Sequence, residues 1–191
     1  MTEALVFSEA IDGERVRLRP LRPDDVDVIE RGMAEADEQS MPSGPPPRGE
    51  LVRRVDAGGR LDERGTLDLG IEVAGRLIGD VQARQPRYAL PPGAFELGIS
   101  IFDPADRGKG YGREAVALIT SFLFESDAHR VQVSTDVSNG AMRGVLERMG
   151  FALEGVLRSF MPSSTGPRDY ALYAITQPDW KTLKETWTTR S

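Results

Sequence analysis

A run of glycines and cations, DRGKGYGREAVALI, occupies residues 106–119 and passes directly into apolar residues at helical spacing. The first amides of a helix have no acceptor within the helix, and they lie at the positive end of its dipole, so such a loop can bind an anion. Glycines at 108, 110 and 112 remove Cβ atoms that would keep a phosphate away from the backbone. The expected chemistry is binding of a phosphate or diphosphate, and the alternative is a tight turn with solvated cations.

The spacing of this loop excludes two well-known phosphate loops. A Walker A loop needs a glycine five positions before the Gly-Lys pair and a Ser or Thr after it, but the chain has Asp103 and Gly110 there. A dinucleotide fingerprint needs a third glycine where Arg113 follows Gly108 and Gly110. The pattern that remains is Arg107-x-x-Gly-x-Gly112, between an alternating strand and an amphipathic helix.

The elements around the loop are predicted from hydrophobic periodicity. Alternation predicts strands from Val16 (VRLRPL), at 67–73, 76–84, 95–101 and 129–137, and from positions 151 and 169; helical spacing predicts helices after Pro23, at 51–57, after the glycine loop, from 139 to Gly150 and over QPDWKTLKETW. In the strand at 95–101, apolar residues share one face, and Glu96, Gly98 and Ser100 share the other. The segment 37–50 is rich in Pro, Gly and Ser, which predicts a mobile loop, and its part 41–50 a lid. The order of elements indicates an α+β fold.

Composition narrows the class of protein. A chain of 191 residues with 39% hydrophobic residues is expected to form a single domain, 1–191, with its core at about 16–180. The formal charge of −6 gives no basic surface for nucleic acid, and the lack of cysteine excludes disulfides and thiolate metal sites. No metal is predicted. The absence of a basic and then apolar leader, and of a long apolar run, predicts a cytoplasmic protein with no membrane partner.

Three ordered motifs resemble the GNAT superfamily of N-acetyltransferases. Arg107, Gly110 and Gly112 match its acetyl-CoA loop, while NGAMRGVLERMGF (139–151) and the C-terminal PDW are similar to its RimJ/RimL-like branch, which acetylates ribosomal protein N-termini. The resemblance implies the GNAT acyl-CoA N-acyltransferase fold. That fold is a mixed, mostly antiparallel sheet of about seven strands flanked by helices, with strands 4 and 5 splayed apart.

The same resemblance implies acetyl-CoA (coenzyme A) as cofactor and assigns residues to it. The implied cofactor-binding residues are Ile99, Ile101, Arg107, Gly108, Lys109, Gly110, Tyr111, Gly112, Arg113 and Asn139. The backbone from Ile99 to Ile101 would pair with pantetheine in the gap between the splayed strands. Asn139 would bind the pantetheine arm, cap the following helix, or do both. Gly98 either allows close approach of the thioester or marks a bulge.

Transfer to an amine requires a base, because an alkyl amine near pKa 10.4 is free base in roughly one molecule in a thousand or fewer at pH 7. Glu96 is the predicted catalytic residue, since members of the similar branch use a glutamate at this place. The alternative is a solvent-facing carboxylate or a partner for a nearby arginine. Asp136 is a weaker candidate, and His129 is expected to be exposed.

The proton donor for the departing thiolate and the acceptor remain open. Related enzymes often have Ser where this chain has Met142. Methionine cannot donate a proton, and the helical spacing of Met142 favours packing in the core. The remaining candidates for the proton donor are Tyr170, Tyr173 and water. Without cysteine, direct attack in a ternary complex is expected. The acceptor is a peptide N-terminus or a cationic small molecule, and a homodimer is an open alternative. The competing function is a non-catalytic acyl-CoA-binding module or sensor, which Met142 favours.

Overall fold

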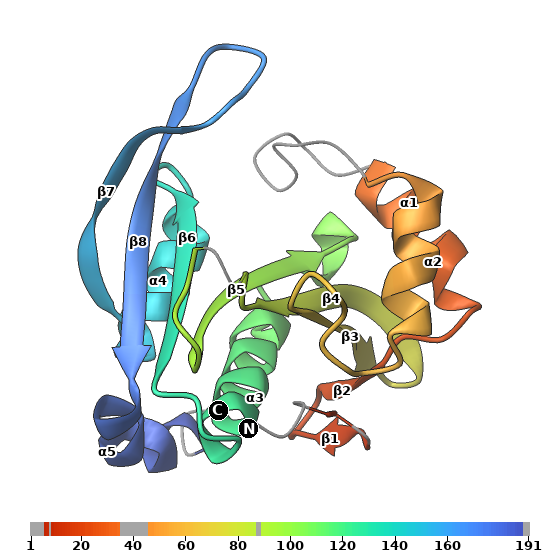
Figure 1. The fold of residues 1–191 in the computed structure, drawn as a ribbon, viewed down its shortest axis with the longest axis horizontal. Coiled ribbons are helices and arrows are strands. Elements are labelled where there is room, and N and C mark those ends of the chain that lie inside the picture. The colour runs from red at the N-terminus through yellow and green to blue at the C-terminus, as the bar shows by residue number, and fades with distance from the viewer. Residues whose placement is uncertain (1–5, 8, 35–45, 87–88, 189–191) are drawn as a thin grey trace.

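The computed structural model describes residues 6–7, 9–34, 46–86 and 89–188, which form one eight-stranded sheet in the order β1-β2-β3-β4-β5-β6-β8-β7 (Figure 1). The strands are β1 Ile11–Asp12, β2 Arg17–Pro20, β3 Thr66–Val73, β4 Arg76–Arg84, β5 Ala94–Ile101, β6 Arg130–Asp136, β7 Ala152–Met161 and β8 Arg168–Thr176. The helices are α1 Asp25–Ala34, α2 Arg48–Asp56, α3 Tyr111–Glu125, α4 Gly140–Arg148 and α5 Gln177–Thr188, with a short 3-10 helix at Pro104–Asp106.

The predicted α+β class and mixed, mostly antiparallel sheet are confirmed. The additional strand is β1, which is too short to show alternation in the sequence. Helix α2 begins at Arg48, three residues before the predicted start at 51. Of the segment predicted to be a lid, residues 41–45 lie outside the described residues, and 48–50 form the first turn of α2.

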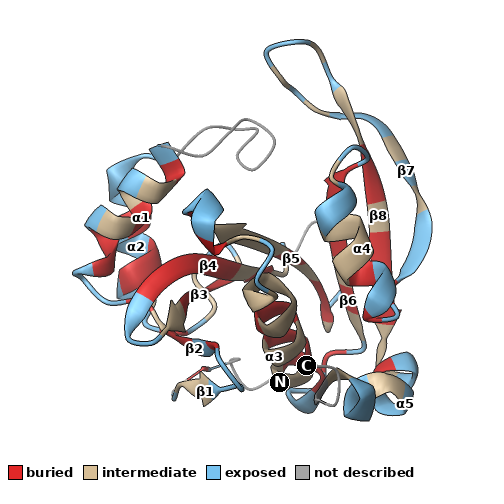
Figure 2. Ribbon diagram, turned by 180° about the vertical axis from the view of Figure 1, so that it is seen from behind, coloured by how far each residue is buried: buried red, intermediate tan, exposed pale blue. Residues whose placement is uncertain are grey.

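Both faces of the central strands are covered, which explains why β3 and β4 are buried almost throughout (Figure 2). Helix α3 packs on one face, against β2, β4, β5 and β6, while α1 and α2 contact β4 and β3 respectively. The predicted apolar stripe of β5 lies in the main core. Its members are Phe95, Leu97, Ile99 and Ile101. The opposite face of the same strands therefore carries the polar groups.

Helix α1 is fixed to the sheet by a buried ion pair. Arg19 of β2 donates two hydrogen bonds to Asp25 at the start of the helix, from Nη1 at 2.7 Å and Nη2 at 3.0 Å. Its Nε also donates to Glu72 of β3 at 2.6 Å. The predicted helical stripe Val26, Ile29 and Met33 is buried behind this pair. The first helix and the sheet edge are thus held in one orientation.

The sheet divides at its single parallel junction. Strands β5 and β6 pair over only three rows, which end at Glu96 and Gln132. Beyond that row β5 continues along β4 to Ile101, and β6 continues along β8 to Asp136. Figure 1 shows the two groups of strands separating above α3. Strands β5 and β6 are the fourth and fifth of the strands expected from the sequence. Their expected splay is confirmed.

Strand β7 forms the outer edge of the sheet and is largely exposed, including Leu153, Val156 and Phe160 (Figure 2). The described helices include none that is long and apolar enough to cross a membrane. The described residues also include no group of three or more His, Asp or Glu placed to hold a metal ion.

Candidate functional site

The glycine loop connects β5 to α3, and two of its glycines have left-handed backbone conformations. Gly108 has φ +73° and Gly110, the N-cap of α3, has φ +86°, where other residues are strained. Because Gly110 has no side chain to cap the helix, the amides of the first turn lie uncovered by a capping group at the positive end of the dipole. A Cβ at Gly108 would meet no atom within 4 Å, so the backbone there is open to a ligand.

The cations of the loop differ in their placement. The Lys109 ammonium is half-exposed and lies 3.3 Å from Asp106 Oδ1, a loose contact that leaves it at the loop surface. Arg107 instead turns back to the end of β5, where its Nε donates to the Ile101 carbonyl at 3.1 Å. The hydrogen bond from Arg76 holds the pKa of Asp106 below its usual range. Arg107 therefore braces the loop, and Lys109 adds charge to it.

Arg15 is a site residue that the sequence reasoning missed. It lies in the turn between β1 and β2, and its Nη1 donates to the Lys109 carbonyl at 2.9 Å. Its guanidinium lies 5.4 Å from the centroid of the Tyr111 ring, and a Cβ at Gly110 would come within 2.9 Å of its Nη2. Glu114 of α3 accepts the Arg15 amide at 2.8 Å. A fourth cation thus covers the loop from a segment distant in sequence.

Glu96 occupies the last paired row between β5 and β6, at the point where the strands separate. Its carboxylate accepts hydrogen bonds from Ser134 Oγ at 3.0 Å and Gln132 Nε2 at 3.2 Å, and Arg84 Nη2 lies 3.4 Å away. The side chain is 25% exposed. Strand neighbours therefore orient the carboxylate while part of it stays open to solvent. The contact with Arg84 matches the alternative role considered for Glu96, that of a partner for a nearby arginine.

The weaker candidates for the base have other roles. Asp136 is buried and accepts two hydrogen bonds from Ser138, from the amide at 2.8 Å and from Oγ at 2.6 Å. Burial opposes its ionisation, but these bonds and the pair with Arg168 outweigh burial and hold the pKa of Asp136 below its usual range. Its carboxylate therefore organises the turn after β6. His129 is exposed just before β6, as predicted.

Helix α4 begins as predicted. Asn139 Oδ1 accepts the Met142 amide at 3.1 Å, which confirms the N-cap, and the Met142 side chain packs against the main core. Of the two tyrosines considered as proton donors, Tyr173 is fully buried, and its hydroxyl donates to Glu147 Oε1 at 2.6 Å. Its proton is therefore not available to a leaving thiolate. Burial and the nearby Asp136 charge raise the pKa of Tyr170. Tyr170 thus keeps its proton at neutral pH.

The predicted site residues fall into two groups. The glycine loop, Ile99 and Ile101 come together on the β5 side of the divergence, whereas Asn139 stands on the β6 side, at the start of α4. Both isoleucines are partly buried against the main core, so it is their backbone beyond the last paired row that is placed to meet a ligand. A Cβ at Gly98 would lie 3.4 Å from Arg84 Nη2, on the polar face that holds Glu96. The alternation of apolar and polar residues at 95–101 thus predicted the two faces of β5 correctly.

Comparison with known proteins agrees with this arrangement. The family model described as an acetyltransferase (GNAT) domain matches residues 15–152. The chain is 34% identical over 135 residues to a probable N-acetyltransferase, YjcK, of Bacillus subtilis (strain 168), covering 69% of this chain and 73% of that protein.

Solved structures extend the likeness to nearly the whole chain. A probable acetyltransferase (GNAT family) from Chromobacterium violaceum ATCC 12472 superposes with a TM-score of 0.73 at 26% identity, covering 91% of this chain and 89% of that one. Mycobacterium smegmatis RimJ, solved in complex with CoA-disulfide, has a TM-score of 0.75 at 20% identity, covering 96% and 94%. At that identity RimJ supports the fold alone.

Proposed function

Because the chain belongs to the acetyltransferase (GNAT) family, we propose that it transfers the acetyl group of acetyl-CoA to a primary amine by direct attack in a ternary complex. The observation that supports this most strongly is the divergence of β5 and β6. It begins at Glu96, and the glycine loop follows the far end of β5 in the chain. The acceptor is a peptide N-terminus or a small-molecule amine. The RimJ/RimL-like motifs support the peptide, and a fold shared with RimJ is compatible with it.

The chain's own groups fit coenzyme A. Open backbone at Gly108, the first-turn amides of α3 and the half-exposed Lys109 offer donors and positive charge to a diphosphate, and Arg15 adds a further guanidinium. The β5 backbone from Ile99 to Ile101 has no β6 partner among the described residues, so it can pair with an amide-bearing pantetheine arm. Asn139, already a helix cap, stands on the other side of the divergence.

Acetyl-CoA, when bound, supplies an activated thioester. Glu96 accepts the proton that an ammonium acceptor must lose before its nitrogen can attack, directly or through a water. Ser134 and Gln132 hold the carboxylate in place for this task. Tyr170 or water remains as proton donor to the leaving thiolate, since Tyr173 is bonded to Glu147. A thiol near pKa 8.5 leaves without strong assistance.

The competing function is an acyl-CoA-binding module without turnover. The packing of Met142 in the core favours it, because no hydroxyl stands at that position to protonate a thiolate. Incubation of the protein with acetyl-CoA and a panel of amines decides between the two. Enzymatic transfer gives thiol release and a mass gain of one acetyl group on an amine, whereas coenzyme A binding without release for any amine would establish the module.

Gly110→Asp is expected to weaken coenzyme A binding by about tenfold or more, because it places a Cβ and a negative charge among the first-turn amides. Isothermal titration calorimetry measures the change in dissociation constant. The matched control is Gly75→Asp, which has a similar φ of +78° in the turn between β3 and β4 and open space around its Cβ. Equal dissociation constants for the two variants would place the diphosphate elsewhere.

A further inference from the structure

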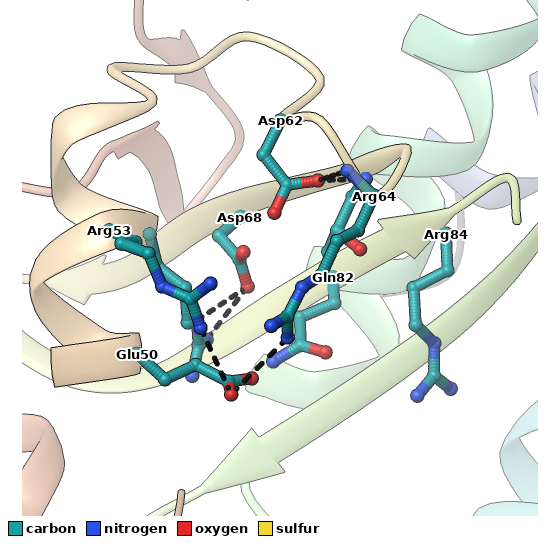
Figure 3. Close-up of a pocket in the computed structure, with 9 residues that line it drawn as sticks. Glu50, Arg53, Asp62, Arg64, Asp68, Gln82 and Arg84 are labelled. Atoms are coloured by element: carbon teal, nitrogen blue, oxygen red, sulfur yellow. Dashed lines mark hydrogen bonds and ion pairs between the residues drawn. The ribbon is translucent and has the colours of Figure 1, made fainter. Parts of the chain in front are cut away.

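A charged cavity of about 170 Å³ lies between α2 and the strands β3 and β4, on the polar face of the sheet (Figure 3). Four arginines line it: Arg53 and Arg54 from α2, Arg64 from the following turn, and Arg84 from β4. The cavity has room for a few non-hydrogen atoms, since a water occupies about 30 Å³ in the liquid. Its size and polarity suit a small ionic group rather than a whole substrate.

Arg54 is the one of these four that is satisfied within the protein. It is buried, and it binds Asp68 with Nε at 2.9 Å and also Asp80. Burial raises the pKa of Asp68 to about 6 despite this arginine. Arg54 and its two carboxylates therefore form the floor of the cavity, and this arginine is not available to a ligand.

The other three arginines are held loosely. Arg53 and Arg64 share a single oxygen, Glu50 Oε2, at 3.4 Å each, and Figure 3 shows them reaching it from two sides. Arg84 contacts Glu96 at 3.4 Å. Their side chains are 48%, 56% and 43% exposed, respectively. Ion pairs this long and this exposed contribute little to stability, so a ligand carboxylate can replace them at low cost. Each guanidinium offers five N–H donors in a fork that matches a carboxylate.

The cavity adjoins the proposed base. Strand register places Arg84 opposite Glu96 and Gln82 opposite Gly98, and both β4 side chains line the cavity. Neighbouring strands lie about 5 Å apart. A short side chain or a dipeptide can therefore span the distance from a group bound at Arg84 and Arg64 to the Glu96 carboxylate. One acceptor molecule can therefore reach both places at once.

We propose that this cavity binds a carboxylate on the acceptor, with Arg64 and Arg84 as its ligands, so that the enzyme prefers amines that carry an acid group. The inference deepens the proposed function and depends on it. It narrows the proposed acceptors to amines that carry a carboxylate, which the guanidinium groups of the cavity would attract. An acidic residue near a peptide N-terminus and a free amino acid offer the same chemistry, and the test separates them.

The test uses two matched pairs of acceptors. The first pair is alanyl-aspartyl-alanine amide and alanyl-asparaginyl-alanine amide, and the second is 4-aminobutanoate and 4-aminobutanamide. Within at least one pair the carboxylate is expected to have a kcat/KM about tenfold or more above that of its amide, and the pair that shows the preference identifies the source. Arg64→Gln is expected to reduce that ratio to near one through KM. Arg17→Gln, which removes a similarly exposed arginine from β2, should retain the preference.

Each result decides something different. Acetylation of both members of each pair at equal rates overturns the carboxylate site and leaves the transferase intact. Loss of the preference in Arg17→Gln as well as Arg64→Gln also overturns it, because a general surface field would then be responsible. If no amine is acetylated, the proposed transferase fails, and binding of glutarate is compared by calorimetry. Weaker binding to Arg64→Gln than to the wild type would still support the cavity as a carboxylate site, and equal binding would reject it.

Discussion

Glu96→Gln is expected to lower kcat for amine acetylation by about a hundredfold, while coenzyme A binding changes little. The substitution keeps the shape of the side chain and its place between Ser134 and Gln132, but it removes the proposed proton acceptor at the start of the strand divergence. We expect coenzyme A binding to be unaffected, because the hydrogen-bond partners of this side chain lie on β4 and β6 and not in the glycine loop. Steady-state thiol release and calorimetry measure the two quantities separately.

The pH profile separates a base from a merely structural residue. Because the acceptor amine becomes free base as the pH approaches about 10, the deficit of Glu96→Gln should shrink with rising pH. A constant deficit would indicate that Glu96 only supports the fold. Asp136→Asn serves as the comparison, since its carboxylate is already bonded to Ser138 and Arg168. Normal turnover in Glu96→Gln together with loss in Asp136→Asn would reassign the base.

Arg54→Met is expected to lower the free energy of unfolding by about 3–5 kcal/mol, the range found when one partner of a buried ion pair is removed. The side chain is only 6% exposed, and it is the shared partner of Asp68 and Asp80. Without it two buried carboxylates face each other across β3 and β4. Urea unfolding at pH 7 measures the loss. Arg53→Met, which removes a half-exposed neighbour on the same helix, should cost less than about 1 kcal/mol.

The loss should also depend on pH. The pKa of Asp68 is already raised to about 6 from the 3.8 of an ordinary Asp, and removal of Arg54 raises it further. A carboxyl group whose pKa is higher in the folded state binds more protons there, so its contribution to stability falls as the pH rises from about 4 towards the folded pKa. The deficit of Arg54→Met is therefore larger near pH 7.5 than near pH 5.5. A deficit that grows on acidification would contradict this assignment.

The sequence predicted most of the elements, because their patterns are local. Alternation along β5 identified both its core face and the polar position of Glu96, and the glycines identified the turn into α3. Asn139 was recognisable as a cap from its place before an apolar stripe. These features depend on residues a few positions apart, so a single sequence is enough to read them.

The parts that escaped prediction depend on distant residues. Arg15 contacts a carbonyl 94 positions away, and no motif near it signals that contact. Arg54 meets Asp68 and Asp80, which are 14 and 26 positions along the chain. In the sequence such arginines resemble ordinary surface charges, and only the pairing of α2 with the sheet makes them partners. The charged cavity beside Glu96 could therefore not be foreseen.

The short junction between β5 and β6 has a mechanical consequence. Three paired rows join these strands, against six between β4 and β5 and seven between β6 and β8, so of these three junctions it is the one most easily bent. Any widening of the divergence between β5 and β6 amounts to a rotation of one group of strands relative to the other about this junction. Glu96 lies at the pivot and moves least, while Ile101, roughly 17 Å farther out, swings most. If Glu96 is the proposed base, acceptors of different bulk would thus meet a proton acceptor that stays in place.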